Sequence, residues 1–121
     1  MKNKVVIVDD NANNLLLEKD LMEVAGFEVF EAVNALDGIA MIIKESPDVI
    51  IMDIRLPDMS GIEAIHILRQ NKEISNIPVV FVTASVLEIE RQALVAITNS
   101  GFISKPIDTR TFAKDVSEFI K

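Results

Sequence analysis

The sequence predicts an α/β protein built on a five-stranded parallel sheet with five helices in a doubly wound arrangement. Short apolar runs alternate with longer segments of helical periodicity along all 121 residues, and strands separated by helices form parallel sheets covered on both faces. Four of the apolar runs end on polar residues, which are Asp9 and Asp10, Asp53, Thr83 and Lys105. Because parallel strands end at one edge, where open sheets bind ligands, we expect these side chains to lie together.

The first predicted strand and helix occupy residues 4–9 and 12–25. The strand sequence KVVIVD is β-branched, apolar and too short for a helix. Gly26 stands where the C-terminal cap of the helix belongs. The core-facing residues of this helix are expected at positions i, i+4 and i+7, which are Leu17, Leu21 and Val24.

The second strand is predicted at residues 27–32. Its sequence FEVFEA alternates apolar and acidic residues, which is typical of an edge strand with one solvated face. Asn34 can cap the next helix, and Pro47 follows its end. The apolar residues at helical spacing here are Leu36, Ile39, Ala40 and Ile43.

The third strand, residues 48–53, is the most apolar and is expected at the centre of the sheet. Ser60 and Glu63 then form a capping box, which opens a helix to about Gln70.

The fourth strand is predicted at residues 77–83. A second capping box, Ser85 with Glu88, opens a helix to about Ile97. The expected core-facing residues are Val86, Ile89, Ala93 and Ile97. Leu87 and Leu94 lie off this stripe with Arg91 between them, which indicates either a partner-binding face or a wider buried face.

The fifth strand is predicted at residues 101–105, with Pro106 next to it. Asp108 or Thr109 can cap the last helix. The apolar residues on one face of that helix are Phe112, Val116, Phe119 and Ile120.

Composition narrows the class of protein. The net charge is −7, from 19 acidic and 12 basic residues, which disfavours direct binding to nucleic acid. The chain has no cysteine, and its apolar runs are shorter than a membrane span or a secretory signal requires. No segment has the composition of a linker, so we expect one domain over residues 1–121 without an effector domain. Because no secretory signal or membrane span is indicated, the expected location is the cytoplasm.

The strand-end acids favour a metal site and phosphoryl chemistry. Three neighbouring carboxylates repel one another unless a cation lies among them, and Mg²⁺ prefers such oxygen ligands. An aspartate can also act as a nucleophile and form an aspartyl phosphate. Lys105 offers a positive charge and Thr83 a hydroxyl donor for a phosphoryl group.

The chain resembles response-regulator receiver domains, the CheY-like family, over its entire length. The resemblance lies in the segments VVIVDDN, DVIIMDIRLPDMSG, PVVFVTAS and GFISKPI, in this order. It implies the strand order 2-1-3-4-5. Since no output domain is expected, the chain looks like the single-domain receivers, which include the CheY and DivK types. The resemblance also implies Mg²⁺-dependent transfer of a phosphoryl group from a histidine kinase or histidine phosphotransfer protein, and a conformational signal to a downstream protein. No nucleic acid or membrane partner is implied, and the expected state is a monomer or a weak phosphorylation-dependent dimer.

The resemblance assigns roles to individual residues. Asp53 is the expected phosphoacceptor. Asp10 and Asp53 are expected to bind Mg²⁺ directly with the backbone carbonyl of Arg55, and Asp9 through a metal-bound water. Thr83 and Lys105 are expected to contact the phosphoryl group.

The resemblance also implies a switch and a partner surface. Thr83 and Phe102 are the expected switch residues, and the Lys105–Pro106 bond is expected to be cis. Phenylalanine replaces the commoner tyrosine of the family at 102, so we expect its inward form to be populated without phosphate. The expected partner surface consists of Leu87, Arg91, Leu94 and Phe102.

Two questions stay open at this point. The side chain of Arg55 either shields an aspartyl phosphate from water or extends into solvent. The chain could also be a scaffold that no longer uses phosphate, or a metal-dependent phosphatase, although such enzymes often carry a second aspartate where Arg55 stands. We expect self-catalysed phosphorylation and dephosphorylation rather than enzymatic turnover.

Overall fold

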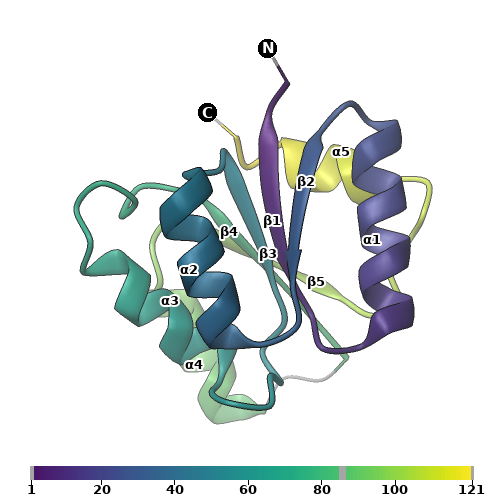
Figure 1. The fold of residues 1–121 in the computed structure, drawn as a ribbon. Coiled ribbons are helices and arrows are strands. Elements are labelled where there is room, and N and C mark those ends of the chain that lie inside the picture. The colour runs from purple at the N-terminus through teal and green to yellow at the C-terminus, as the bar shows by residue number, and fades with distance from the viewer. Residues whose placement is uncertain (1, 85–86, 121) are drawn as a thin grey trace.

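The computed structural model describes residues 2–84 and 87–120, and it shows a single parallel sheet with helices on both faces (Figure 1). The strands are β1 (Lys4–Val8), β2 (Glu28–Ala32), β3 (Val49–Met52), β4 (Val79–Thr83) and β5 (Ser100–Ser104). The helices are α1 (Ala12–Val24), α2 (Ala35–Glu45), α3 (Gly61–Arg69), α4 (Glu88–Ala96) and α5 (Phe112–Ser117). The strand order is β2-β1-β3-β4-β5, which confirms the predicted fold class.

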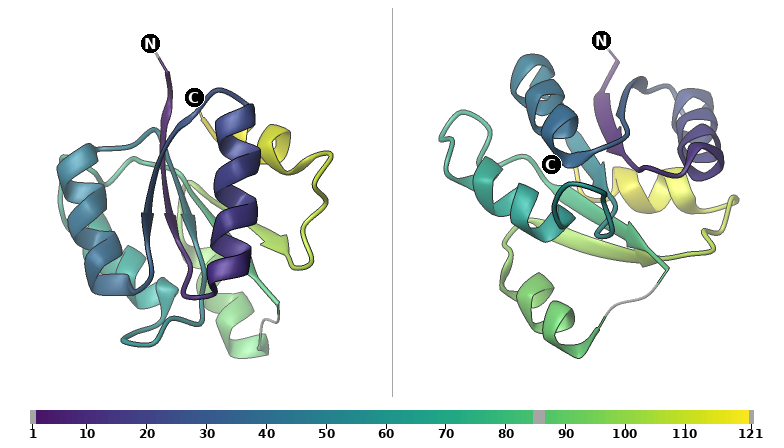
Figure 2. Two further views of the ribbon diagram at one scale, coloured as in Figure 1. Left: turned by 45° about the vertical axis from the view of Figure 1, so that its right-hand side comes forward. Right: turned by 60° about the horizontal axis from the view of Figure 1, so that its bottom comes forward.

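The sheet separates two apolar cores. Helices α2, α3 and α4 cover one face and α1 and α5 the other (Figures 1 and 2). Alternate residues of each strand point to opposite faces, so Phe81 joins the first core while Val80 and Val82 join the second. The central strand β3 is buried along its whole length, as the sequence predicted.

Strand β2 forms one edge of the sheet and pairs with β1 alone. Its acidic residues Glu28 and Glu31 are exposed, in agreement with the predicted edge strand. Side-chain charge on an edge strand hinders pairing with a second sheet.

The predicted core-facing residues of α1 and α2 were only partly correct, because Leu21 and Ile39 pack against the two cores but the other predicted residues are exposed. In α1 the buried positions are Leu15, Glu18 and Met22, whereas Val24 is 89% exposed. In α2 the buried residues include Gly38, which lies so close to β1 that a Cβ at this position would be 2.7 Å from Cγ2 of Val8. A side chain at position 38 would therefore push α2 away from the sheet, and the larger residues Leu36 and Ile43 lie outside.

The last two helices begin later than predicted. Helix α4 begins at Glu88 after Leu87, so the predicted start at Ser85 is too early, and Ser85 and Val86 lie outside the described residues. Helix α5 begins at Phe112 because Asp108 instead closes the preceding turn, where its carboxylate accepts the backbone N–H of Arg110.

Within residues 2–84 and 87–120, no helix is long and apolar enough to cross a membrane.

Candidate functional site

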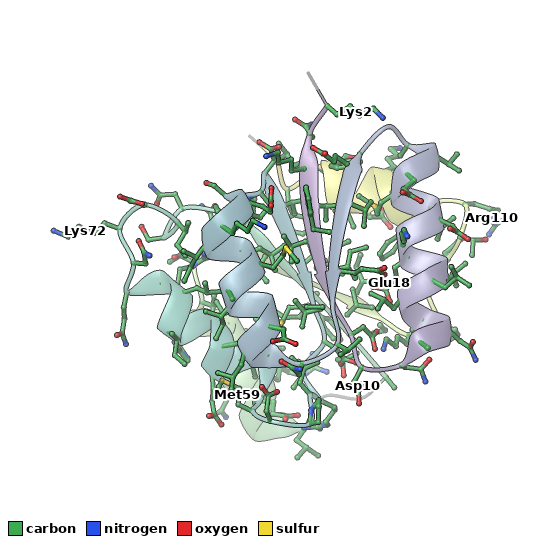
Figure 3. All side chains as sticks on the ribbon, in the orientation of Figure 1. Lys2, Asp10, Glu18, Met59, Lys72 and Arg110 are labelled. Carbon is green, nitrogen blue, oxygen red and sulfur yellow. The ribbon has the colours of Figure 1, made fainter. Side chains whose placement is uncertain are left out.

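Three carboxylates meet at the carboxyl edge of the sheet. Asp9 and Asp10 follow β1 and Asp53 follows β3, and the pairing of Val8 with Met52 sets these strand ends side by side. The backbone N–H of Asp53 donates to the carbonyl of Val8 at 2.9 Å, which fixes this register to the last residue. One carboxylate oxygen from each aspartate lies within 4.8 Å of the others. Asp10 is exposed at this edge (Figure 3), and Asp9 and Asp53 are buried.

Lys105 supplies positive charge to this cluster. It follows β5, and its Nζ lies 3.0 Å from Oδ2 of Asp9 and 3.2 Å from Oδ2 of Asp53. The Lys105 backbone N–H donates to the carbonyl of Thr83 at 2.9 Å, so the buried Thr83 lies beside it at the end of β4. The Lys105–Pro106 peptide is cis, as expected.

Burial and ion pairing set the charge states of the site. Burial raises the pKa of Asp53, although Lys105 opposes this shift. Burial alone would lower the pKa of Lys105, but its hydrogen bond to Asp9 and the charges of Asp9 and Asp53 raise it. The ammonium form of Lys105 is therefore held firmly, and it is the only cationic side chain within hydrogen-bond distance of the described cluster.

The donor set fits a divalent hard cation. Asp9, Asp10 and Asp53 carry three negative charges, and Lys105 offsets one of them, which leaves two. Carboxylate oxygens from two buried aspartates and the exposed Asp10 match the ligand preferences of Mg²⁺. The backbone N–H of Arg55 donates to Oδ1 of Asp53 at 3.2 Å, so the main chain of Arg55 lies next to the same carboxylate.

The side chain of Arg55 lies in neither of the two places considered from the sequence. Its guanidinium forms a bidentate ion pair with Glu90 of α4, in which Nη2 lies 2.8 Å from Oε1 and Nη1 contacts Oε2. Glu90 Oε1 also accepts the backbone N–H of Leu87 at 2.9 Å. Glu90 was not predicted as a site residue, because nothing in the local pattern connects it to a loop 35 residues earlier.

Glu18 is a fourth acid at the site, and it was not predicted from the sequence. It projects from α1 toward the sheet (Figure 3) and is 2% exposed, and its Oε1 has no hydrogen-bond partner among the described residues. Burial, together with the charge of nearby Asp9, raises its pKa to about 8. Glu18 and Lys105 line the same cavity of about 110 Å³. Leu15 and Met22, three positions before and four after it, place Glu18 on the core side by helical spacing.

The loop between β3 and α3 is held on its other side by α2. The carboxylate of Asp58 accepts the backbone N–H groups of Ala35 at 2.8 Å and Leu36 at 2.9 Å, at the N-terminus of α2. Gly61 closes the loop, and a Cβ there would lie 2.1 Å from the carbonyl oxygen of Asp53. Only glycine therefore lets α3 start this close to the phosphoacceptor candidate.

The predicted partner surface lies on α4 and β5. Phe102 is 40% exposed, and with Arg91, Leu94 and Val95 it lines a small apolar hollow of about 110 Å³. Leu87 is exposed, but Leu94 is half-buried and packs against the core, which favours the wider buried face considered above. Phe102 stands outward in this structure, and population of its inward form stays a prediction.

The strand order places the protein among flavodoxin-like doubly wound folds, and its acid cluster lies at the carboxyl edge, where such folds bind ligands. The family model for the response regulator receiver domain matches residues 5–117. The chain therefore belongs to the response regulator receiver family.

Individual relatives agree with this membership. The polar-differentiation response regulator DivK of Brucella anthropi is 33% identical over 120 residues, which is 99% of this chain and 98% of that protein. The chemotaxis response regulator CheY4 of Vibrio cholerae superposes with a TM-score of 0.91 at 26% identity, over 99% of this chain and 100% of that one.

A more distant structure carries a metal ion. The receiver domain of a sensor histidine kinase from Pseudomonas aeruginosa has a TM-score of 0.88 at 19% identity, with 98% of both chains covered, and holds a magnesium ion in its active-site cleft.

Proposed function

We propose that this receiver domain is a phosphoacceptor response regulator, which takes a phosphoryl group on Asp53 and signals to protein partners through a conformational switch. One observation carries the proposal. The buried carboxylate of Asp53 lies 3.2 Å from the ammonium of Lys105 and within 4.8 Å of oxygens from two further aspartates. In this arrangement Asp53 can attack a phosphoryl group, and the cation of Lys105 can then hold the negatively charged product.

Asp53 is the nucleophile of the proposed reaction. One of its carboxylate oxygens attacks phosphorus in line, the bond from phosphorus to the donor nitrogen or oxygen breaks, and the donor leaves with the electron pair. Lys105 stabilises the charge on the transferring group, and the hydroxyl of Thr83 is proposed to donate to a phosphoryl oxygen.

Asp10, Asp53 and the backbone carbonyl of Arg55 are the proposed direct Mg²⁺ ligands, and Asp9 the ligand that acts through water. Bound there, Mg²⁺ would neutralise negative charge on the phosphoryl group. The family relationship and the net charge left on the cluster support this proposal.

The proposed output follows from the new charge. A phosphorylated Asp53 carries about 1.5 to 2 negative charges, which attract Thr83 and leave space that Phe102 can fill. The surface of Leu87, Arg91, Leu94 and Phe102 would then change for a downstream protein. The proposed donor is a histidine kinase or histidine phosphotransfer protein, in the cytoplasm, and the proposed state is a monomer or a weak phosphorylation-dependent dimer.

Intact-mass spectrometry tests the proposal. With Mg²⁺ and acetyl phosphate, the chain should gain one phosphoryl group, and the gain should be absent in Asp53→Asn and without Mg²⁺. A scaffold that no longer uses phosphate would gain none. A phosphatase would release phosphate over many turnovers from a substrate that this chain is expected to consume only slowly.

A further inference from the structure

The ion pair between Arg55 and Glu90 joins the loop that follows Asp53, between β3 and α3, to α4. We propose that Glu90 is a positioning residue, which holds the guanidinium of Arg55 away from a phosphoryl group on Asp53 and so keeps that group open to hydrolysis. The inference rests on the proposed function, because it concerns the lifetime of the phosphoryl group on Asp53.

The pair is well anchored on the α4 side. Both terminal nitrogens of Arg55 bind the carboxylate of Glu90, which is the strongest geometry available to these two groups. Glu90 is itself fixed, because its Oε1 also accepts the backbone N–H of Leu87. The Glu90 side chain is 15% exposed and that of Arg55 48% exposed, so the carboxylate is sheltered and the arginine approaches it from solvent.

The main chain of Arg55 is fixed at the phosphoacceptor. Its N–H donates to Oδ1 of Asp53 at 3.2 Å, and Arg55 pairs with Ser60 in an isolated antiparallel bridge. Only the torsions of its side chain therefore decide where the guanidinium lies. In this structure they direct it to α4.

A phosphoryl group on Asp53 would compete for Arg55. It carries about 1.5 to 2 negative charges against the single charge of a carboxylate, and it would lie next to the main chain of the same residue. The bidentate bond to Glu90 opposes the exchange. Without Glu90, the guanidinium is free to bind the phosphoryl oxygens on the solvent side.

A guanidinium in that position slows hydrolysis. In this step a water oxygen attacks phosphorus opposite the Asp53 oxygen, and the bond between phosphorus and Asp53 breaks. The carboxylate leaves with the electron pair, and the protons of the water leave with inorganic phosphate. A planar cation over the phosphoryl group occupies the approach of this water. Glu90 thus shortens the lifetime of the phosphorylated state by holding Arg55 elsewhere.

The half-life of the aspartyl phosphate tests the inference. Each variant is phosphorylated with acetyl phosphate and Mg²⁺, freed of donor, and followed by intact-mass spectrometry. Glu90→Gln keeps the size of the side chain and an oxygen for the Leu87 N–H, but it loses the ion pair. We expect this substitution to lengthen the half-life about twofold to fivefold, the range that corresponds to an exposed ion pair.

The effect must pass through Arg55. In an Arg55→Ala background, the substitution Glu90→Gln should therefore leave the half-life unchanged. Glu73→Gln, which removes the same charge from an exposed residue after α3, is the matched control and should behave as the unsubstituted chain. If amide spectra show that Glu90→Gln disturbs α4, Glu90→Asp replaces it, because the shorter acid keeps the charge but weakens the bidentate contact.

Specific outcomes overturn the inference. An unchanged or shortened half-life in the Glu90 variants, or a lengthening that persists in the Arg55→Ala background, would show that Glu90 does not act by holding Arg55. Failure of the unsubstituted chain to accept phosphate would remove the proposed function and this inference together. Normal phosphorylation with equal half-lives would remove the inference alone.

Discussion

Glu18 is an acidic residue at a buried position of α1, where an apolar residue is usual. It lies between Leu15 and Met22 on the buried side of α1, behind the carboxylates of the candidate site. The predicted stripe of Leu17, Leu21 and Val24 did not include Glu18, and the buried side of α1 runs instead through Leu15, Glu18 and Met22, with Leu21 partly buried beside it. Its burial near Asp9, in a cavity shared with Lys105, extends the site behind the sheet edge.

The first prediction concerns the pH dependence of stability. Folding raises the pKa of Glu18 from 4.5 to about 8, so the folded state binds this proton more tightly than the unfolded state does. Its contribution to the free energy of unfolding therefore falls as pH rises from about 4.5 to about 8. Glu18→Leu should remove this loss, and its gain in stability should grow by a few kcal/mol between about pH 5 and about pH 9.

Urea unfolding with metal chelated at both pH values measures this gain. Glu23→Leu, at an exposed position of the same helix, is the control and should show little change at either pH. An equal gain for Glu18→Leu at both pH values would mean that Glu18 does not titrate on folding.

At the scale of the elements, apolar residues alone did not identify the buried faces. In α2 the helix packs through Ala35, Gly38 and Ile42 rather than through Leu36 and Ile43, because its close approach to β1 at Gly38 sets which side faces the sheet. The strands were predicted to within a residue or two, since continuous β-branched runs have few alternatives. The α4 boundary was missed because the predicted capping box, Ser85 with Glu88, comes before the observed start, at which Leu87 is the N-cap residue.

The second prediction separates two neighbouring residues of α4. Leu94 is half-buried against the core, whereas Val95 is 82% exposed. Leu94→Asp should cost about 1–2 kcal/mol of stability, because it brings a charge to partly buried apolar surface. Val95→Asp should leave the melting temperature nearly unchanged. Thermal unfolding followed by circular dichroism measures both, and equal losses would show that α4 packs with a different face.

At the scale of the whole molecule, residues from the ends of β1, β3 and β5 meet at one edge of the sheet. This arrangement was predictable, whereas the buried faces of the helices were predicted only in part. Asp9, Asp10, Asp53 and Lys105 meet because every strand is parallel and each group follows its strand directly. The contacts of Arg55 and Asp58 were not predictable from the sequence, because they depend on how the loop after β3 packs against α4 and α2.

The third prediction concerns metal binding to the folded state. Mg²⁺ should raise the melting temperature, because it binds a cluster with two excess negative charges that unfolding disperses. At about one hundred times the dissociation constant the stabilisation should be about 2.7 kcal/mol. Asp10→Asn should abolish most of the effect, while Asp20→Asn, on the exposed side of α1, should retain it. A stabilisation that survives Asp10→Asn would place the ion elsewhere.

Two side chains of the loop from Asp53 to Gly61 bind neighbouring helices. The carboxylate of Asp58 binds the N-terminus of α2, and the guanidinium of Arg55 binds Glu90 of α4. If this short loop shifts, either the contact of Asp58 or that of Arg55 must break, or the helix that it binds must move with the loop. A displacement at Asp53 is thereby coupled to α2 and α4, the two helices on either side of α3.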